Sequence, residues 1–173
     1  PAETTAAATE AETTAAESAA EESSAEETKA AADIETVTPG KLTVATSPDF
    51  APYEFYAIGE DGTPKLAGFD MDLAQYIADY LGLELEVVTV DFDGVISELQ
   101  TKSVDLGMAG LSPDEKRMGI MDFSDLYYMG GQSLVTVKDN AEKYNSFEAI
   151  NKPDVSVGAQ VGSIQMDLAN ENS

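Results

Sequence analysis

The chain has 173 residues, of which 33 are acidic and 9 are basic, and its formal net charge at pH 7 is -24. This negative charge disfavours nucleic acid and anionic membrane surfaces as partners. The sequence contains neither cysteine nor histidine, which excludes disulfide frameworks, thiolate chemistry and the common zinc sites, so we expect neither a cofactor nor a metal.

Residues 1–40 are expected to form an acidic linker. Residues 1–32 consist almost entirely of Ala, Glu, Thr and Ser, and such a composition cannot bury enough apolar surface to offset the entropy lost on ordering. All aromatic residues of the chain come later. We predict a flexible tether that holds a folded domain away from a surface, with a disordered terminus of no function as the alternative.

The folded part is expected to begin with a strand over residues 41–46, which are mostly β-branched or apolar. An irregular loop follows, and residues 59–62 predict the tip of a hairpin. A helix over residues 70–81 is expected next, with Asp70 as its N-cap. The apolar side chains of this helix repeat at helical spacing and are predicted to face the core: Leu73, Tyr76, Ile77, Tyr80 and Leu81.

Two further strands are predicted over residues 83–90 and 104–109, and a helix with Asp93 as its N-cap is predicted between them. Ser112 precedes Pro113, Asp114 and Glu115. This order is typical of a capping box with proline at the first helical position, so a short helix is expected there.

The last part of the chain repeats the pattern in a weaker form. Residues 132–137 and 154–158 predict strands, Ser146 is expected to cap a short helix, and an apolar helical segment follows Gly162 and Ser163. We expect a second domain that is cut short after its beginning. The alternative is a complete single domain with a frayed terminus.

The alternation of strands and helices predicts an α/β fold with right-handed βαβ units on a parallel sheet. Ligands of such sheets bind beyond the carboxyl ends of the strands. The loops over residues 47–53, 91–94 and 110–117 follow the three predicted strands, and we expect them to meet at this edge.

Arg117 is the only arginine of the chain. A guanidinium group binds a carboxylate through two parallel hydrogen bonds, and the Ser112 hydroxyl and the Gly110 carbonyl can accept from an ammonium group beside it. Phe50 and Phe92 each follow a predicted strand and can wall a slot for a ligand side chain. These groups fit an α-amino acid. The alternatives are a helix cap, a surface ion pair and ordinary core packing.

The acidic pairs Asp70/Asp72 and Asp91/Asp93 lack the glycine and glutamate of a calcium-binding loop, so we expect helix capping rather than a metal site. The sequence also lacks the patterns G-x-S-x-G, G-x-x-x-x-G-K-[ST] and G-x-G-x-x-G.

Taken in order, several segments resemble the family 3 extracellular solute-binding proteins, which are the polar amino acid receptors of ABC importers. The resemblance extends from about residue 41 to residue 163. It rests on residues 42–46, 50–55, 68–73, 91–94, 104–112 and 121–124, together with Arg117.

The resemblance implies a type II periplasmic-binding-protein-like fold, in which two α/β lobes joined by a hinge close on one amino acid. Residues 41–137 would form lobe 1, with a parallel-rich sheet and flanking helices. Residues 138–173 would form the start of a truncated lobe 2.

The resemblance also assigns roles to the candidate residues. Arg117 would bind the α-carboxylate of the ligand, helped by the Ser112 backbone N–H and by the loop at Gly162 and Ser163. Gly110 and Ser112 would receive the ligand ammonium group through a carbonyl and a hydroxyl.

Phe50 and Phe92 match the aromatic walls around the ligand side chain. Ser47 stands where several binders of cationic and amide amino acids have aspartate. This difference disfavours a basic ligand.

The implied function is a binding protein without enzymatic activity that delivers a polar L-amino acid to a membrane permease. The implied location is extracytoplasmic, in the periplasm or at the cell surface. Surface attachment would use an N-terminal lipid anchor on a cysteine that this chain does not contain, after removal of a signal peptide. The alternatives within the same fold are an amino acid sensor or receptor input domain, a lytic-enzyme module and a dehydratase.

Overall fold

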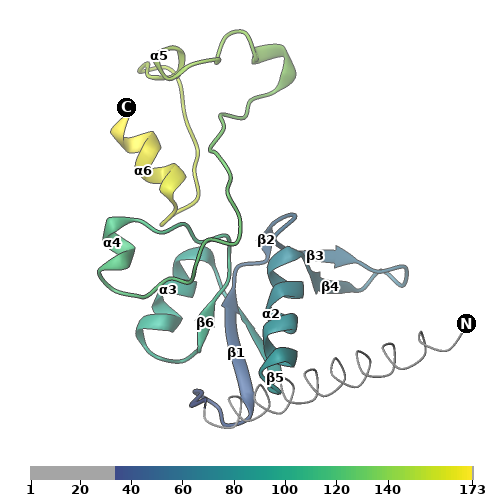
Figure 1. Ribbon diagram of the computed structural model, residues 1–173. Helices are drawn as coiled ribbons and strands as arrows, with labels where there is room; N and C mark the ends of the chain where they lie inside the picture. The colour runs from purple at the N-terminus through teal and green to yellow at the C-terminus, as the bar shows by residue number, and fades with distance from the viewer. Residues whose placement is uncertain (1–33, 173) are drawn as a thin grey trace, which may run out of the picture.

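The computed structural model describes residues 34–172, so most of the predicted linker lies outside the described residues. Strand β1 (Lys41–Thr46) lies between β5 (Glu84–Thr89) and β6 (Leu106–Gly107), and both neighbours run parallel to it. The three strands predicted for this part of the chain are therefore confirmed, although β6 is shorter than expected. Figure 1 shows β1 between β6 and β5 in the lower part of the view.

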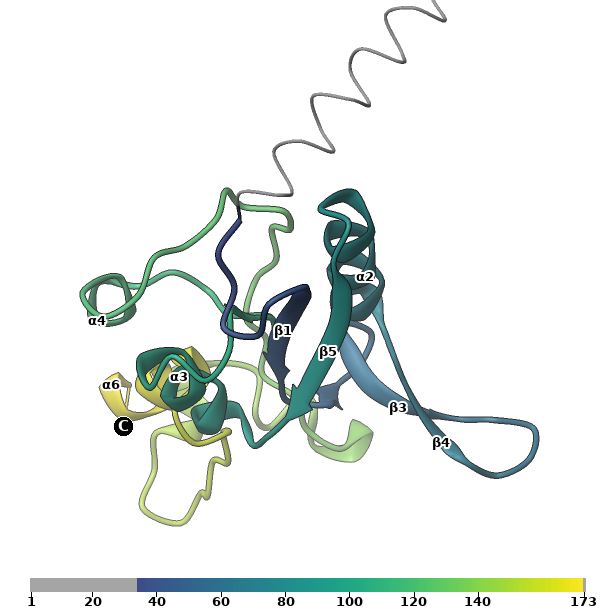
Figure 2. The ribbon, with the colours of Figure 1, turned by 90° about the horizontal axis from the view of Figure 1, so that it is seen from below.

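Helices α2 (Phe69–Tyr80) and α3 (Phe92–Gln100) cover the two faces of this sheet, as Figure 2 shows. Side chains alternate between the faces of a strand, and β1 uses both. Val44 packs with Ala74 of α2, whereas Ala45 packs with Val95 of α3. The α/β fold with a parallel sheet and flanking helices is thus confirmed.

The predicted apolar face of α2 is confirmed in part, since Leu73 and Ile77 pack against the core. Met71, Ala74 and Ala78 are buried, while Tyr76 and Tyr80 are exposed. The small alanine side chains bring the helix close to β1, and the larger tyrosines remain at the solvent side.

A second, antiparallel sheet precedes α2 and contains β2 (Asp49–Phe50), β3 (Glu54–Ile58) and β4 (Pro64–Ala67). The predicted hairpin tip joins β3 to β4, where the Gly59 N–H donates to the Thr63 carbonyl at 2.8 Å. Strand β2 was not expected, because the loop after β1 contains two prolines that argue against a strand.

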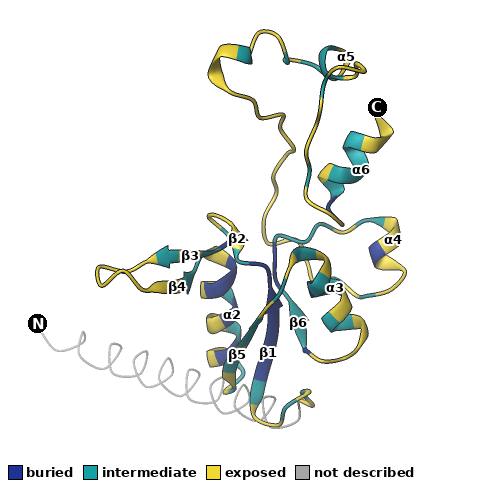
Figure 3. Ribbon diagram, turned by 180° about the vertical axis from the view of Figure 1, so that it is seen from behind, coloured by how far each residue is buried: buried dark blue, intermediate teal, exposed yellow. Residues whose placement is uncertain are grey.

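The chain after residue 118 contains little regular structure. Its elements are the 3-10 helix η1 (Lys138–Asn140) and helices α5 (Phe147–Ile150) and α6 (Ile164–Glu171). Most of this part is exposed, as Figure 3 shows. The cap predicted at Ser146 is confirmed, since its side chain accepts a backbone N–H in the first turn of α5. The helical segment predicted after Ser163 is confirmed as α6, and the Ser163 side chain caps it in the same way.

The strands predicted over residues 132–137 and 154–158 are wrong. A strand requires hydrogen bonds to a neighbouring backbone, and neither segment pairs with any strand within residues 34–172. The alternating side chains favour an extended chain but do not supply a partner.

Three predicted helix caps are also wrong. Asp91 rather than Asp93 occupies the N-cap of α3, and Asp114 rather than Ser112 occupies that of α4 (Glu115–Met118). Helix α2 begins after Gly68 and uses no side chain as a cap. Asp70 is instead buried inside the first turn of α2.

Backbone carbonyls replace the missing cap of α2. The N–H groups of Phe69 and Asp70 donate to the carbonyls of Pro52 and Tyr53 at 3.0 and 2.9 Å. This close approach requires a glycine at position 68, because a Cβ there would overlap the Tyr53 carbonyl and φ is +132°. The loop after β1 is therefore attached to the start of α2.

No helix within residues 34–172 has the length and apolarity needed to cross a bilayer.

We expect Gly68→Ala to lower the free energy of unfolding by about 3 kcal/mol, since it adds both a strained φ and a backbone overlap. The control is Gly62→Ala at the hairpin tip, where φ is +78° but the space around a Cβ is empty; it should cost only ~1–2 kcal/mol. Urea unfolding of the two variants measures the difference. Equal losses would contradict the role assigned to the Tyr53 carbonyl.

Candidate functional site

A cavity of about 800 Å³ lies at the carboxyl edge of the parallel sheet. The loops after β1, β5 and β6 each contribute to its lining, as the topology predicts. Five of the residues proposed for the site line it: Phe50, Phe92, Gly110, Ser112 and Arg117.

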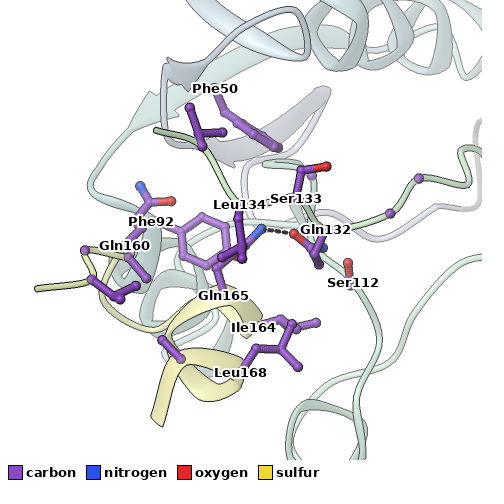
Figure 4. Close-up of a pocket in the computed structure, with 18 of the residues that line it drawn as sticks. Phe50, Phe92, Ser112, Gln132, Ser133, Leu134, Gln160, Ile164, Gln165 and Leu168 are labelled. Atoms are coloured by element: carbon purple, nitrogen blue, oxygen red, sulfur yellow. Dashed lines mark hydrogen bonds between the residues drawn. The ribbon is translucent and has the colours of Figure 1, made fainter. Parts of the chain in front are cut away.

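The remaining walls of the cavity come from the later part of the chain, including residues 132–136 and helix α6. In Figure 4, Phe50, Phe92 and Ser112 surround the same space as Leu134 and Ile164. Segments far apart in the sequence thus converge on one site.

Three of the proposed site residues do not line the cavity. Ser47 is buried, and its hydroxyl lies 3.2 Å from Asp49 Oδ1. Ser163 is buried as the N-cap of α6, and its hydroxyl donates to the Gln160 carbonyl at 2.7 Å. Gly162 contacts the site through its carbonyl, which accepts a hydrogen bond from Arg117.

Arg117 is only 6% exposed, which is unusual for an arginine. Its Nη1 donates to the Ser112 carbonyl at 2.8 Å and its Nη2 to the Gly162 carbonyl at 2.9 Å. Its Nε lies 3.3 Å from Asp114 Oδ2, and the guanidinium carbon lies 5.6 Å from the centre of the Phe92 ring. The side chain is therefore held in one orientation at the cavity wall.

Asp114 has two roles that the sequence analysis did not assign to it. Its Oδ1 accepts a hydrogen bond from the backbone N–H of Arg117 at 2.8 Å and so caps α4. Its Oδ2 forms an ion pair with the Arg117 side chain. The signal was present in the three-residue spacing of the two residues, which suits a cap and an ion pair equally well. The capping-box pattern at Ser112 predicts a different cap for the same helix.

Two side-chain N–H groups of Arg117 remain available to bind an anion. A guanidinium group has five N–H bonds, and the three contacts of Arg117 occupy one on each nitrogen. Each terminal nitrogen therefore keeps one N–H that a carboxylate can accept. The hydroxyl of Ser112 has no hydrogen-bond partner within residues 34–172 and lies on the same cavity wall.

Polar contacts connect the last part of the chain to the sheet region across the cavity. Besides the bond from Arg117 to Gly162, Gln160 Nε2 donates to Asp49 Oδ2 at 3.0 Å. Lys116 Nζ lies 3.0 Å from Asp167 Oδ2 of α6. This ion pair is exposed, so it contributes at most about 1 kcal/mol.

Two acidic side chains, Glu54 and Asp70, are fully buried next to the site. Asp70 accepts hydrogen bonds from the Gly110 N–H and the Tyr127 hydroxyl. Neither carboxyl oxygen of Glu54 has a hydrogen-bond partner in the described part of the chain. Burial, followed by the negative charges of Asp70 and Asp49, raises the pKa of Glu54 to about 9. Glu54 is therefore protonated at neutral pH.

Within residues 34–172, no group of three or more Asp and Glu side chains is arranged to hold a metal ion.

A family model described as bacterial extracellular solute-binding proteins, family 3, matches residues 42–168. The arginine-binding extracellular protein ArtP of Bacillus subtilis is 37% identical over 133 residues, covering 77% of this chain and 49% of that protein. The cyclohexadienyl dehydratase of Pseudomonas aeruginosa is 30% identical over 133 residues. This match covers 77% of the present chain and 48% of the dehydratase. The chain thus spans about half the length of the curated relatives it matches.

A similar solved structure is that of AbpA, an amino acid ABC transporter substrate-binding protein from Streptococcus pneumoniae bound to L-arginine. It is 38% identical, with a TM-score of 0.73, and the match covers 76% of this chain and 54% of the other.

We expect the unfolding temperature to depend on pH through Glu54. Its folded pKa is raised from 4.5 to about 9, so its stabilising contribution is complete below the unfolded pKa and is lost as the pH rises through 9. Because glutamine does not titrate, the Glu54→Gln variant should not lose stability in this way. The melting temperature of the variant minus that of the parent should therefore rise between pH 5 and pH 10.

Melting temperatures of the parent, Glu54→Gln and the exposed control Glu60→Gln over this range test the expectation. Parallel curves for the parent and Glu54→Gln would contradict it.

Proposed function

The chain belongs to family 3 of the bacterial extracellular solute-binding proteins, and on that basis we propose that it is part of the substrate-binding component of an ABC importer. The component binds a polar L-amino acid and delivers it to a membrane permease without covalent chemistry. The main support is the buried Arg117, which keeps one free N–H on each terminal nitrogen at the cavity wall.

In the proposed complex, the α-carboxylate of the ligand accepts from the two free N–H groups of Arg117. The ammonium group donates to the Gly110 carbonyl and the Ser112 hydroxyl, and Phe50 and Phe92 flank the ligand side chain. All five residues line one cavity, which supports this arrangement. A cavity of about 800 Å³ also lies within the usual range for sites of small molecules.

We propose that residues 41–137 belong to one lobe and residues 138–173 to the beginning of a second. The cavity is lined by loops at the sheet edge and by the later segments, as expected of a site between two lobes. The polar contacts from Arg117 to Gly162 and from Gln160 to Asp49 would then connect the two lobes. Gly162 and Ser163 would support the carboxylate site from the second lobe.

Among polar amino acids, a cationic one is the first candidate. ArtP is named as an arginine-binding protein, and AbpA was solved with L-arginine. The serine at position 47, where several binders of cationic amino acids have aspartate, argues against a basic ligand. Ser47 is buried and lies outside the cavity lining, so it does not itself contact a ligand in the cavity.

The proposed location is extracytoplasmic, because the family consists of extracellular proteins and the related ArtP carries that description. Attachment through an N-terminal lipid and the partnership with a permease belong to the same proposal.

A dehydratase is the second candidate, since the Pseudomonas aeruginosa relative carries that name. A catalytic role would require an acidic group at the cavity. The acidic residues that line the cavity, Asp125 and Asp154, are exposed, whereas the buried Glu54, whose pKa is raised to about 9, does not line it. Because a general acid or base is usually tuned by burial, this arrangement favours binding over catalysis. A sensor domain or lytic-enzyme module would use the same site for binding.

We expect one or two L-amino acids, with L-arginine foremost, to raise the melting temperature of the full-length protein, because a ligand of the folded state stabilises it by mass action. A thermal-shift screen of the common amino acids measures this. Turnover of a cyclohexadienyl substrate without any shift would favour the dehydratase instead.

Arg117→Ala should abolish binding of the amino acid identified in this screen. Arg117→Lys should weaken it by about 2 kcal/mol, or roughly 30-fold, since an ammonium group cannot form two parallel bonds to a carboxylate. Lys65→Gln removes one positive charge from the exposed strand β4 and serves as the control. Isothermal titration of the full-length variants gives the affinities, and parent-like binding by Arg117→Lys would contradict the proposed contact.

A further inference from the structure

Asp70 joins three parts of the chain that are distant in sequence. It lies in the first turn of α2 and is fully buried. Its Oδ2 accepts the Gly110 N–H at 3.1 Å, and its two oxygens lie 3.1 and 3.2 Å from the Tyr127 hydroxyl. One side chain therefore connects α2 to the loop after β6 and to the segment that leaves the sheet region.

The bond to Gly110 orients the beginning of the loop that contains Ser112 and Arg117. Gly110 has a φ of +56°, and a Cβ at this position would lie 2.9 Å from the ring of Phe50. Because its N–H is held by Asp70 and its other side is covered by Phe50, the peptide has little freedom to rotate. The Gly110 carbonyl, which is proposed to accept from the ligand ammonium group, belongs to the next peptide group, and its direction depends on the backbone conformation of the same residue.

The bond to Tyr127 orients a second element of the cavity. The Tyr127 ring stacks on Phe69, with the ring centres 5.9 Å apart, and the residue lines the cavity. Burial and the charge of Asp70 raise the pKa of Tyr127 above its ordinary value, so its hydroxyl keeps the proton that it donates.

Glu54 completes the environment of Asp70. Its carboxyl is buried without a hydrogen-bond partner in the described part of the chain, and burial together with the nearby charges raises its pKa to about 9, so Glu54 itself is neutral. Two buried like charges would repel each other strongly. A neutral Glu54 adds no second negative charge beside the oxygens that accept from Gly110 and Tyr127.

We propose that Asp70 is a positioning residue of the amino acid site. Without touching the ligand, it fixes the loop at Gly110 and the segment at Tyr127 in their positions around the cavity. This inference rests on the proposed function. It explains why an acidic side chain occupies a fully buried position where the sequence pattern predicts a helix cap.

The test uses the full-length protein with Asp70→Asn and Tyr127→Phe. The control is Asp72→Asn, which removes a charge from an exposed position on the same helix. Titration calorimetry with L-arginine should show a loss of affinity of roughly tenfold for Asp70→Asn, the loss typical of one hydrogen bond to a charged group. Tyr127→Phe should lose about threefold, and the control should match the parent.

A loss of stability alone would not shift one particular amide of the folded protein, whereas loss of the bond from Gly110 to Asp70 would. We therefore expect the Gly110 amide to shift upfield in the nitrogen–proton spectrum of ligand-free Asp70→Asn, because its N–H loses a charged acceptor. This second readout needs no ligand, so it remains informative if the parent binds no amino acid and the proposed function fails.

An unchanged Gly110 amide, or parent-like affinity in a folded Asp70→Asn, would overturn the inference. If Asp70→Asn does not fold, Tyr127→Phe decides it, since this variant keeps the ring stack and removes only the hydroxyl. Parent-like affinity in Tyr127→Phe would then exclude the positioning role.

Discussion

The restraint of Arg117 determines how the rest of the site is arranged. Its guanidinium group is bound at once by Asp114, by the Ser112 carbonyl and by the Gly162 carbonyl. The first two contacts hold the side chain against its own loop, and the third connects it to the last part of the chain. A buried cation requires such partners, because desolvation of an unpaired charge costs several kcal/mol.

The fold brings these groups together through the direction of its strands. The three parallel strands end at the same edge, so the loops after them converge on one cavity. Backbone contacts then attach the loops to neighbouring elements, as Gly68 shows where α2 meets the Tyr53 carbonyl. The buried Asp70 adds a side-chain link between α2 and Gly110. Affinity for a ligand would thus depend on residues behind the cavity wall as well as on those that line it.

The sequence was sufficient to predict the elements that pack around the parallel sheet. Strand β1 and helix α2 follow from local apolar periodicity, and the two faces of β1 are filled by small and branched side chains. Five site residues could be identified because glycine, serine, phenylalanine and arginine follow the ends of predicted strands. The resemblance to a known family assigned their roles, which remain predictions.

Features that depend on distant partners could not be predicted in this way. Asp70 matches the pattern of a helix cap, but carbonyls of a preceding loop occupy the N–H groups that it would have bound. Residues 132–137 have a strand-like pattern without a neighbouring strand among the described residues. The raised pKa of Glu54 arises from burial beside Asp70 and Asp49, and no local pattern indicates that proximity.

The most direct test of the central claim compares the best-binding amino acid with the amine that lacks its α-carboxylate, which for L-arginine is agmatine. Titration calorimetry of the full-length protein should show that removal of the carboxylate weakens binding roughly 100-fold or more, because Arg117 would lose its anionic partner inside a buried site. Similar affinities for the two compounds would contradict the claim that Arg117 binds the carboxylate of an amino acid.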